Sequence, residues 1–143
     1  MKVYRNLDTL PPFINAVVTI GTFDGVHVGH QKIIHQLLNE SKRTGGESVL
    51  ITFHPHPRKI VKPHESLMQL TTMEERIELL KQLGINNMVV VPFTKDFSQQ
   101  TALQYVENFL VERFHPATII IGYDHKFGNN REGDYRMLEQ YAH

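Results

Sequence analysis

The sequence predicts an α/β fold in which a mostly parallel, doubly wound sheet is covered by helices on both faces. Short apolar, β-branched runs alternate with segments of helical period four times along the 143 residues, as is typical of βαβ units with right-handed crossovers. The run 118–121 is continuously apolar or β-branched, which favours burial on both faces of the sheet. Ligands of such sheets bind beyond the carboxyl ends of the strands.

The strands are predicted at residues 16–20, 48–53, 88–91 and 118–121, after a candidate edge strand at Val3 and Tyr4. The first helix follows the loop 22–25 and ends at Gly45. Thr71 or Thr72 can cap the second helix, Thr101 the third and Asp134 a last one. The three full helices carry apolar stripes at Ile33, Ile34, Leu37 and Leu38, at Met73, Ile77, Leu80 and Leu83, and at Leu103, Val106, Phe109 and Leu110. Residues 54–70 and 93–100 are predicted as irregular connections.

Composition excludes several classes of function. The chain contains 15 Lys and Arg, 15 Asp and Glu, and no Cys, so it has no net basic field for nucleic acid and no thiolate, disulfide or Cys-based zinc chemistry. No apolar stretch approaches the roughly 20 residues of a membrane span, and no signal-type segment follows Met1. We therefore expect a cytoplasmic enzyme or binding domain whose partners are small molecules rather than nucleic acid or membrane. The oligomeric state stays open.

The most informative stretch of the sequence is the loop that connects the strand 16–20 to the first helix. Gly21, Gly25 and Gly29 remove side chains where a phosphate would approach the backbone, and the first helical turn offers unpaired N–H groups and a partial positive charge. His27 and His30, about one helical turn apart, add hydrogen-bond donors. These parts predict a polyphosphate cradle whose donors stabilise charge that develops during phosphoryl or nucleotidyl transfer.

Other candidates have two readings each. Asp24 can make an Asx-type turn or hold a magnesium ion indirectly. His54 and His56 point to opposite faces of an extended segment, so no protein metal site is predicted.

Three segments together resemble a known family. They are Gly21-Thr-Phe-Asp-Gly-Val-His-Val-Gly-His30, Thr52-Phe-His-Pro-His-Pro57, and Gly122-Tyr-Asp-His-Lys-Phe-Gly128 with Arg131 and Gly133. Their order and spacing resemble the N-terminal adenylyltransferase domain of bacterial bifunctional riboflavin kinase/FAD synthetase, in the nucleotidyltransferase superfamily with its His-x-Gly-His motif. The resemblance implies a Rossmann-like fold and the reaction of ATP with FMN to give FAD and pyrophosphate, with Mg²⁺ on the phosphates.

The resemblance also implies residue roles. His27 and His30 would stabilise the transition state at the α-phosphoryl group of ATP. Two further sets are implied: the nucleotide-binding residues Gly21, Thr22, Phe23, Asp24, Gly25, Gly29, Gly122 and Asp124, and the flavin-binding residues Phe53, Pro55, Pro57, Phe127 and Arg131. His125 stands where the family usually has an aromatic residue.

Residues 1–143 are expected to form one adenylyltransferase domain that is incomplete at its C-terminal end, and to bind nucleotide weakly and turn over slowly or not at all because part of the charge clamp on the triphosphate is absent. The Ser/Thr-rich motif ending in arginine and the riboflavin kinase barrel of the family have no counterpart in this sequence, so a longer native protein with both activities is expected. Three alternatives stay open: another phosphate-ester acceptor such as pantetheine phosphate or nicotinamide mononucleotide, a catalytically silent nucleotide- or flavin-binding module, and, as the weakest, a scaffold protein.

Overall fold

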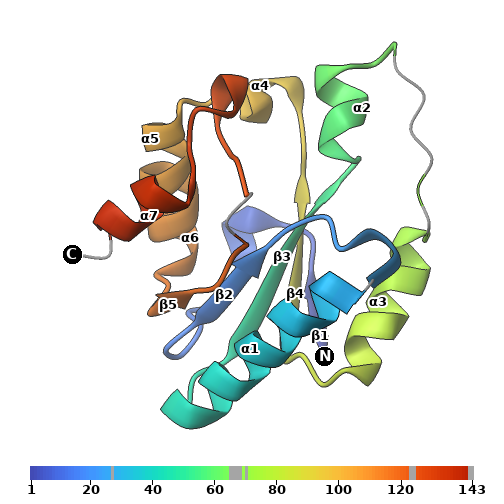
Figure 1. The fold of residues 1–143 in the computed structure, drawn as a ribbon, viewed down its shortest axis with the longest axis vertical. Helices are drawn as coiled ribbons and strands as arrows, with labels where there is room; N and C mark the ends of the chain where they lie inside the picture. The colour runs from blue at the N-terminus through green and yellow to red at the C-terminus, as the bar shows by residue number, and fades with distance from the viewer. Residues whose placement is uncertain (27, 65–68, 70, 123–124, 142–143) are drawn as a thin grey trace.

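The computed structural model describes residues 1–26, 28–64, 69, 71–122 and 125–141, and it contains the predicted parallel sheet (Figure 1). Within these residues, five strands run in the order β1-β4-β3-β2-β5, with every neighbouring pair parallel. The strands are β1 Lys2–Tyr4, β2 Val17–Ile20, β3 Ser48–His54, β4 Asn87–Pro92 and β5 Thr118–Ile119. The candidate edge strand at Val3 and Tyr4 is confirmed as β1.

Helices connect the strands. They are α1 Val28–Thr44, α2 Pro57–Val61, α3 Met73–Gln82, α4 Lys95–Ser98, α5 Ala102–Gln104, the π-helix Tyr105–Val111, α6 Glu112–Phe114 and α7 Tyr135–Tyr141, with short 3-10 turns at Leu7–Thr9, Asp24–Val26 and Asn129–Arg131. Local capping explains where several of them begin. Thr72 with Glu75 and Thr101 with Gln104 form capping boxes, and Asp134 Oδ1 accepts from the Met137 N–H at 3.1 Å, as the sequence predicts.

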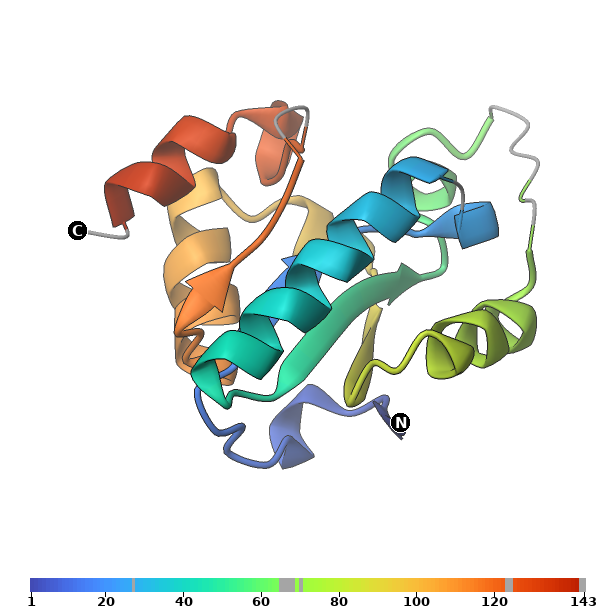
Figure 2. The same cartoon turned by 60° about the horizontal axis from the view of Figure 1, so that its bottom comes forward.

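Both faces of the sheet are covered, which is the doubly wound arrangement. One face packs Val18, Val49 and Val89 against the π-helix, α6 and α7. The other packs Val17, Leu50 and Met88 against α1 and α3, as Figures 1 and 2 show. Neighbouring residues of one strand, such as Val17 and Val18, therefore belong to different cores because side chains alternate across a strand.

The strand order reverses at one place. From β2 the chain adds β3 and then β4 on one side, and later returns to place β5 on the other side of β2. The switch point lies between β2 and β5, where ligands of such sheets bind beyond the carboxyl ends. The loop that begins at Gly21 leaves β2 there and the segment that begins at Gly122 follows β5, while the segment after β3 lies next to them.

Four local predictions were wrong. The connection 54–70 contains α2, where Pro57 fits the first helical position, and 93–100 contains α4, capped by Thr94. The last strand covers only Thr118–Ile119 and is half-buried, because β5 is an edge strand with a single neighbour. Leu103 is 49% exposed, since the buried stripe of this region runs through Ala102, Tyr105, Val106, Phe109 and Leu110.

Candidate active site

The loop from β2 to α1 is anchored to β3. The Gly21 N–H donates to the Ile51 carbonyl at 3.0 Å, which extends the ladder by one residue, and Thr52 Oγ1 donates to the Thr22 carbonyl at 3.2 Å. Gly25 has a positive φ of 77° in the 3-10 turn Asp24–Val26. The loop then enters α1, whose first turn contains Gly29 and His30; His27 lies outside the described residues.

Phe23 anchors this loop, because its side chain is part of the hydrophobic core. Its side chain is 2% exposed in the α1 and α3 core, and its ring centroid lies 5.1 Å from that of His30. A Cβ on Gly21 would come within 3.0 Å of the Phe23 ring. Gly21 is therefore needed for packing against Phe23, besides its predicted role in letting a phosphate approach. The Phe23 ring lies beside the half-buried His30 ring.

Asp24 is tied to the start of α3. Its Oδ1 accepts from the Thr71 N–H at 2.8 Å and from Thr71 Oγ1 at 2.9 Å. Arg76 Nη2 lies 3.5 Å from the same oxygen, with an Arg76 side chain that is 1% exposed. Arg76 was missed at the sequence level, although an arginine at helical spacing between Met73 and Leu80 signals a charge on the inward face of a helix.

His56 is the N-cap residue of α2, and the charges of Asp24 and Arg76 act on its imidazole. Its Nδ1 accepts from the Arg58 N–H at 3.1 Å, so this nitrogen carries a lone pair. Burial, followed by the positive charge of Arg58, lowers the pKa of His56 below its usual value of 6.5, against the opposing pull of Asp24. Both effects keep the imidazole neutral.

Acidification is expected to weaken the fold through His56. Because its pKa is lower in the folded than in the unfolded chain, the unfolded chain binds more protons as pH falls from the unfolded pKa through the folded one, and stability falls with it. His56→Asn keeps an N-cap acceptor and removes the titration. Denaturation between about pH 8 and about pH 5 should give a steeper loss of stability for the wild type than for His56→Asn; equal slopes would contradict this role.

The segment after β3 carries the predicted flavin residues. Phe53 is 7% exposed and packs in an aromatic cluster with Phe93, Phe97 and Phe109, at centroid distances of 5.4, 5.7 and 6.4 Å. Pro55 and Pro57 are half-buried. The two prolines are therefore more accessible to a ligand than Phe53. The flavin contacts of all three residues stay predictions.

The segment 122–133 is hydrogen-bonded to the start of α5. The Asn129 N–H donates to the Gln100 carbonyl at 2.6 Å, and the Ala102 N–H donates to Glu132 Oε1 at 2.9 Å. Phe127, 5% exposed, stacks on Tyr105 at 4.8 Å, so a flavin contact by this ring would require it to be uncovered.

Two other predicted residues of this segment lie at its surface or beside an undescribed stretch. Arg131 is exposed. Gly122 accepts from the His125 N–H at 3.1 Å. Asp124 lies outside the described residues.

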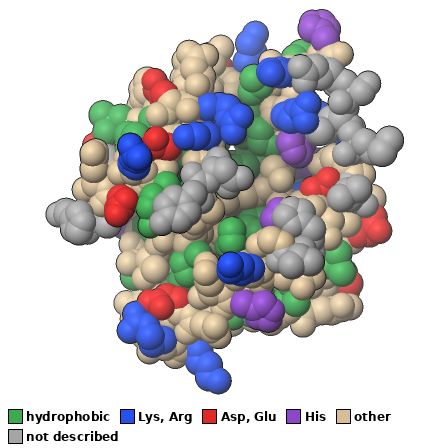
Figure 3. Space-filling view, viewed as in Figure 1, with side chains coloured by type: hydrophobic (Ala, Val, Ile, Leu, Met, Phe, Trp, Pro, Cys, Tyr) green, Lys and Arg blue, Asp and Glu red, His purple; other side chains and the backbone are tan. Residues whose placement is uncertain are grey.

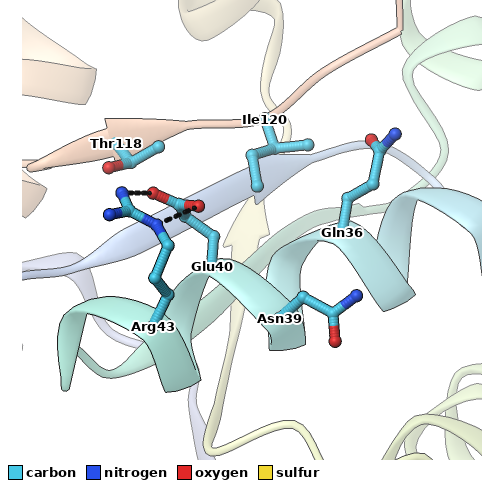
Figure 4. A pocket seen from close by; sticks show the side chains of 6 residues that line it. All are labelled: Gln36, Asn39, Glu40, Arg43, Thr118 and Ile120. Atoms are coloured by element: carbon cyan, nitrogen blue, oxygen red, sulfur yellow. Dashed lines mark hydrogen bonds and ion pairs between the residues drawn. The ribbon is translucent and has the colours of Figure 1, made fainter.

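The described residues form hollows at the surface, and two of them differ in their relation to the predicted site. One of about 260 Å³ lies at the carboxyl edge, with Arg5, His54, Thr71 and Arg76 among its lining residues. Figure 3 shows Lys and Arg side chains gathered around a hollow at this end of the molecule. The other, of about 450 Å³, lies between α1 and β5 and is lined by Gln36, Asn39, Glu40, Arg43, Thr118 and Ile120 (Figure 4); no predicted site residue lines it.

Within the described residues, no group of three His, Cys, Asp or Glu side chains is placed to hold a metal ion. Asp24 could contribute a carboxylate from the loop, and it already accepts from the Thr71 N–H. Mg²⁺ commonly binds through one or two carboxylates plus substrate phosphates, which fits a site of this composition. In the same part of the chain, no helix is both long and apolar enough to span a bilayer.

A glycine-bearing loop that leads from strand to helix, at the switch point of a doubly wound sheet, is characteristic of nucleotide-binding α/β domains. The comparison with protein families identifies the family of such domains to which the chain belongs. The model of the FAD synthetase family matches residues 12–143, and the chain belongs to that family.

Curated relatives extend beyond this chain. It is 33% identical over 141 residues to the "Bifunctional riboflavin kinase/FMN adenylyltransferase" of Buchnera aphidicola subsp. Schizaphis graminum, with 98% of this chain and 45% of the relative covered. It is 35% identical over 130 residues to the protein of the same name from Listeria monocytogenes, with 90% and 41% covered. The chain thus spans less than half the length of these relatives.

A solved structure confirms the fold. The crystal structure titled "Macrolide-efflux Protein from Streptococcus pneumoniae" matches with a TM-score of 0.84, covering 97% of this chain and 46% of that one. The sequence identity is 23%, so the likeness concerns the fold alone.

Proposed function

We propose that this protein is an FMN adenylyltransferase that transfers AMP from ATP to FMN. A phosphate oxygen of FMN attacks the α-phosphorus of ATP, the bond to the β-phosphate oxygen breaks, and its electron pair leaves with pyrophosphate; FAD is the other product. The observation that carries the proposal is the β2–α1 loop of a FAD synthetase family member, which brings Gly25 and the first turn of α1 to the switch point.

The chain's own groups support positioning and electrostatic catalysis. The N-terminal turn of α1 offers backbone donors to a phosphate, and His30 follows in that turn over the Phe23 ring. With His27, it would stabilise charge that builds on the transferring phosphoryl group. The residues proposed to contact the nucleotide are Gly21, Thr22, Gly29, Gly122 and Asp124. The residues proposed to contact the flavin are Pro55, Pro57 and Arg131, together with Phe53 and Phe127, whose buried rings would have to be uncovered first.

Mg²⁺ would be bound mainly by the triphosphate and would neutralise its charge. We also propose a cytoplasmic location, where ATP and FMN are both available. The names of the relatives support the further proposal that residues 1–143 are one domain of a longer protein that also phosphorylates riboflavin.

The test incubates the purified chain with ATP, FMN and Mg²⁺ and follows FAD and pyrophosphate by chromatography. We expect equal amounts of both products, and loss of both when EDTA removes the metal. Pantetheine phosphate and nicotinamide mononucleotide serve as competing acceptors. Preference for either would overturn the assignment of the acceptor, and ATP binding without any product would contradict the proposed activity of residues 1–143.

A further inference from the structure

The start of α3 is linked to the β2–α1 loop by a continuous hydrogen-bond relay. The Gly25 N–H donates to Thr71 Oγ1 at 3.2 Å, and the same hydroxyl donates to Asp24 Oδ1 at 2.9 Å. A hydroxyl has one proton to donate and lone pairs to accept with, so both bonds can exist together. Thr71 thereby fixes two consecutive residues of the loop from a point 46 to 47 positions away.

Arg76 lies behind this relay in an unusual place for a charge. Its side chain is 1% exposed on the inward face of α3, where Met73 and Leu80 belong to the core. Burial lowers the pKa of Arg76 while Asp24 opposes that shift. Within the described residues, Nε has no hydrogen-bond partner, and the recorded ion pair is the one to Asp24 at 3.5 Å.

A buried ion pair is weak evidence for stability, because its desolvation often offsets the Coulomb attraction and replacing both partners by apolar side chains of similar volume often leaves stability unchanged. Such pairs are better explained where they select one conformation. Here Arg76 and Thr71 also line the 260 Å³ hollow. The relay and the cation tie Asp24 to α3 and its start by polar contacts.

We propose that Arg76 is a positioning residue that, through Asp24 and Thr71, holds the β2–α1 loop in the conformation that receives the triphosphate. The inference rests on the proposed function. It assigns Asp24 to anchoring the loop from within the protein. Losing the cation would release Asp24 and Gly25, move the first turn of α1 relative to the substrate, and reduce catalysis with the fold intact, since a misplacement of about 1 Å costs on the order of 100-fold in rate.

The test compares Arg76→Met, which keeps length and removes charge, with Arg76→Lys, which keeps the charge, and with Lys81→Met, a matched change at an exposed position of the same helix. Hydrogen exchange of the peptide covering residues 21–30, the denaturation midpoint and kcat/KM for ATP are measured on each. For Arg76→Met, which leaves the half-buried Asp24 carboxylate without its cation, we expect a lower midpoint with a cooperative transition retained, exchange faster by about tenfold and kcat/KM lower by about 10- to 100-fold. Arg76→Lys should recover most of the activity, and Lys81→Met should resemble the wild type.

Wild-type exchange and kcat/KM in a folded Arg76→Met variant would overturn the proposal. If that variant does not fold, Thr71→Val, which keeps the shape and removes the relay, must show the faster exchange, and its failure to do so would overturn the proposal as well. If the wild type makes no FAD, the proposed function fails, while the exchange of residues 21–30 in the variants still decides whether Arg76 positions the loop.

Discussion

His30→Ala and His27→Ala are each expected to lower the rate of FAD formation by about 100-fold or more while the affinity for ATP changes by less than about tenfold. The reason is that a donor directed at developing charge acts mainly in the transition state. His30 lies in the first turn of α1, with its ring centroid 5.1 Å from that of Phe23, and His27 is predicted about one turn earlier from its spacing. Steady-state kinetics together with an ATP titration measure both quantities.

His35→Ala is the matched control, because His35 is an exposed histidine of the same helix, beyond its first turn. It should retain the wild-type rate. Equal, small effects of all three substitutions would contradict a role in catalysis. A parallel loss of affinity and rate in His27→Ala or His30→Ala would instead assign these side chains to binding of the ground state.

Gly133→Ala is expected to destabilise the protein by about 2–3 kcal/mol. A Cβ there would lie 2.2 Å from Phe127 Cε2, and the Phe127 ring is buried and stacked on Tyr105. The ring would have to move against a packed core, or the paired backbones of Phe127 and Gly133, joined by bonds of 3.1 and 2.8 Å, would have to separate. Denaturant titration of the free energy of unfolding measures the effect.

Two further variants separate space from backbone strain. Gly84 has a φ of +94° and nothing within 4 Å of an added Cβ, so Gly84→Ala should cost only the conformational strain of about 1–2 kcal/mol. Phe127→Leu should relieve part of the Gly133→Ala loss and none of the Gly84→Ala loss, giving coupling of at least about 0.5 kcal/mol in the first pair alone. Additivity in both pairs would show that the contact with Phe127 does not cause the destabilisation.

Local signals predicted most of the fold. β-branched runs marked the strands. Thr71 or Thr72, with a Glu three residues later, and Thr101 marked helix starts, and the structure has capping boxes at Thr72 and Thr101. Errors arose where the decisive partner is distant. The strand 118–121 shortened to Thr118–Ile119 because its place at the sheet edge gives it one neighbour.

The candidate site divides in the same way. Residues 21–30 could be selected from the sequence because glycines and histidines at a strand-to-helix handover form one contiguous local pattern. The family resemblance implied Phe53 and Phe127 as flavin residues, but no local pattern tells that their rings turn into the core against Phe97 and Tyr105. Arg76 could not be connected to Asp24, because 52 residues separate them.

The sequence by itself determined the alternation of strands and helices, the helix caps and the glycine-bearing loop after β2, because each depends on residues within a few positions of one another. Only the tertiary structure decided the strand order, the switch point between β2 and β5, and the anchoring of Asp24 by Thr71 and Arg76. Those features depend on which distant segments pack together to bury both faces of one sheet, and burial is a property of the whole chain rather than of any single stretch.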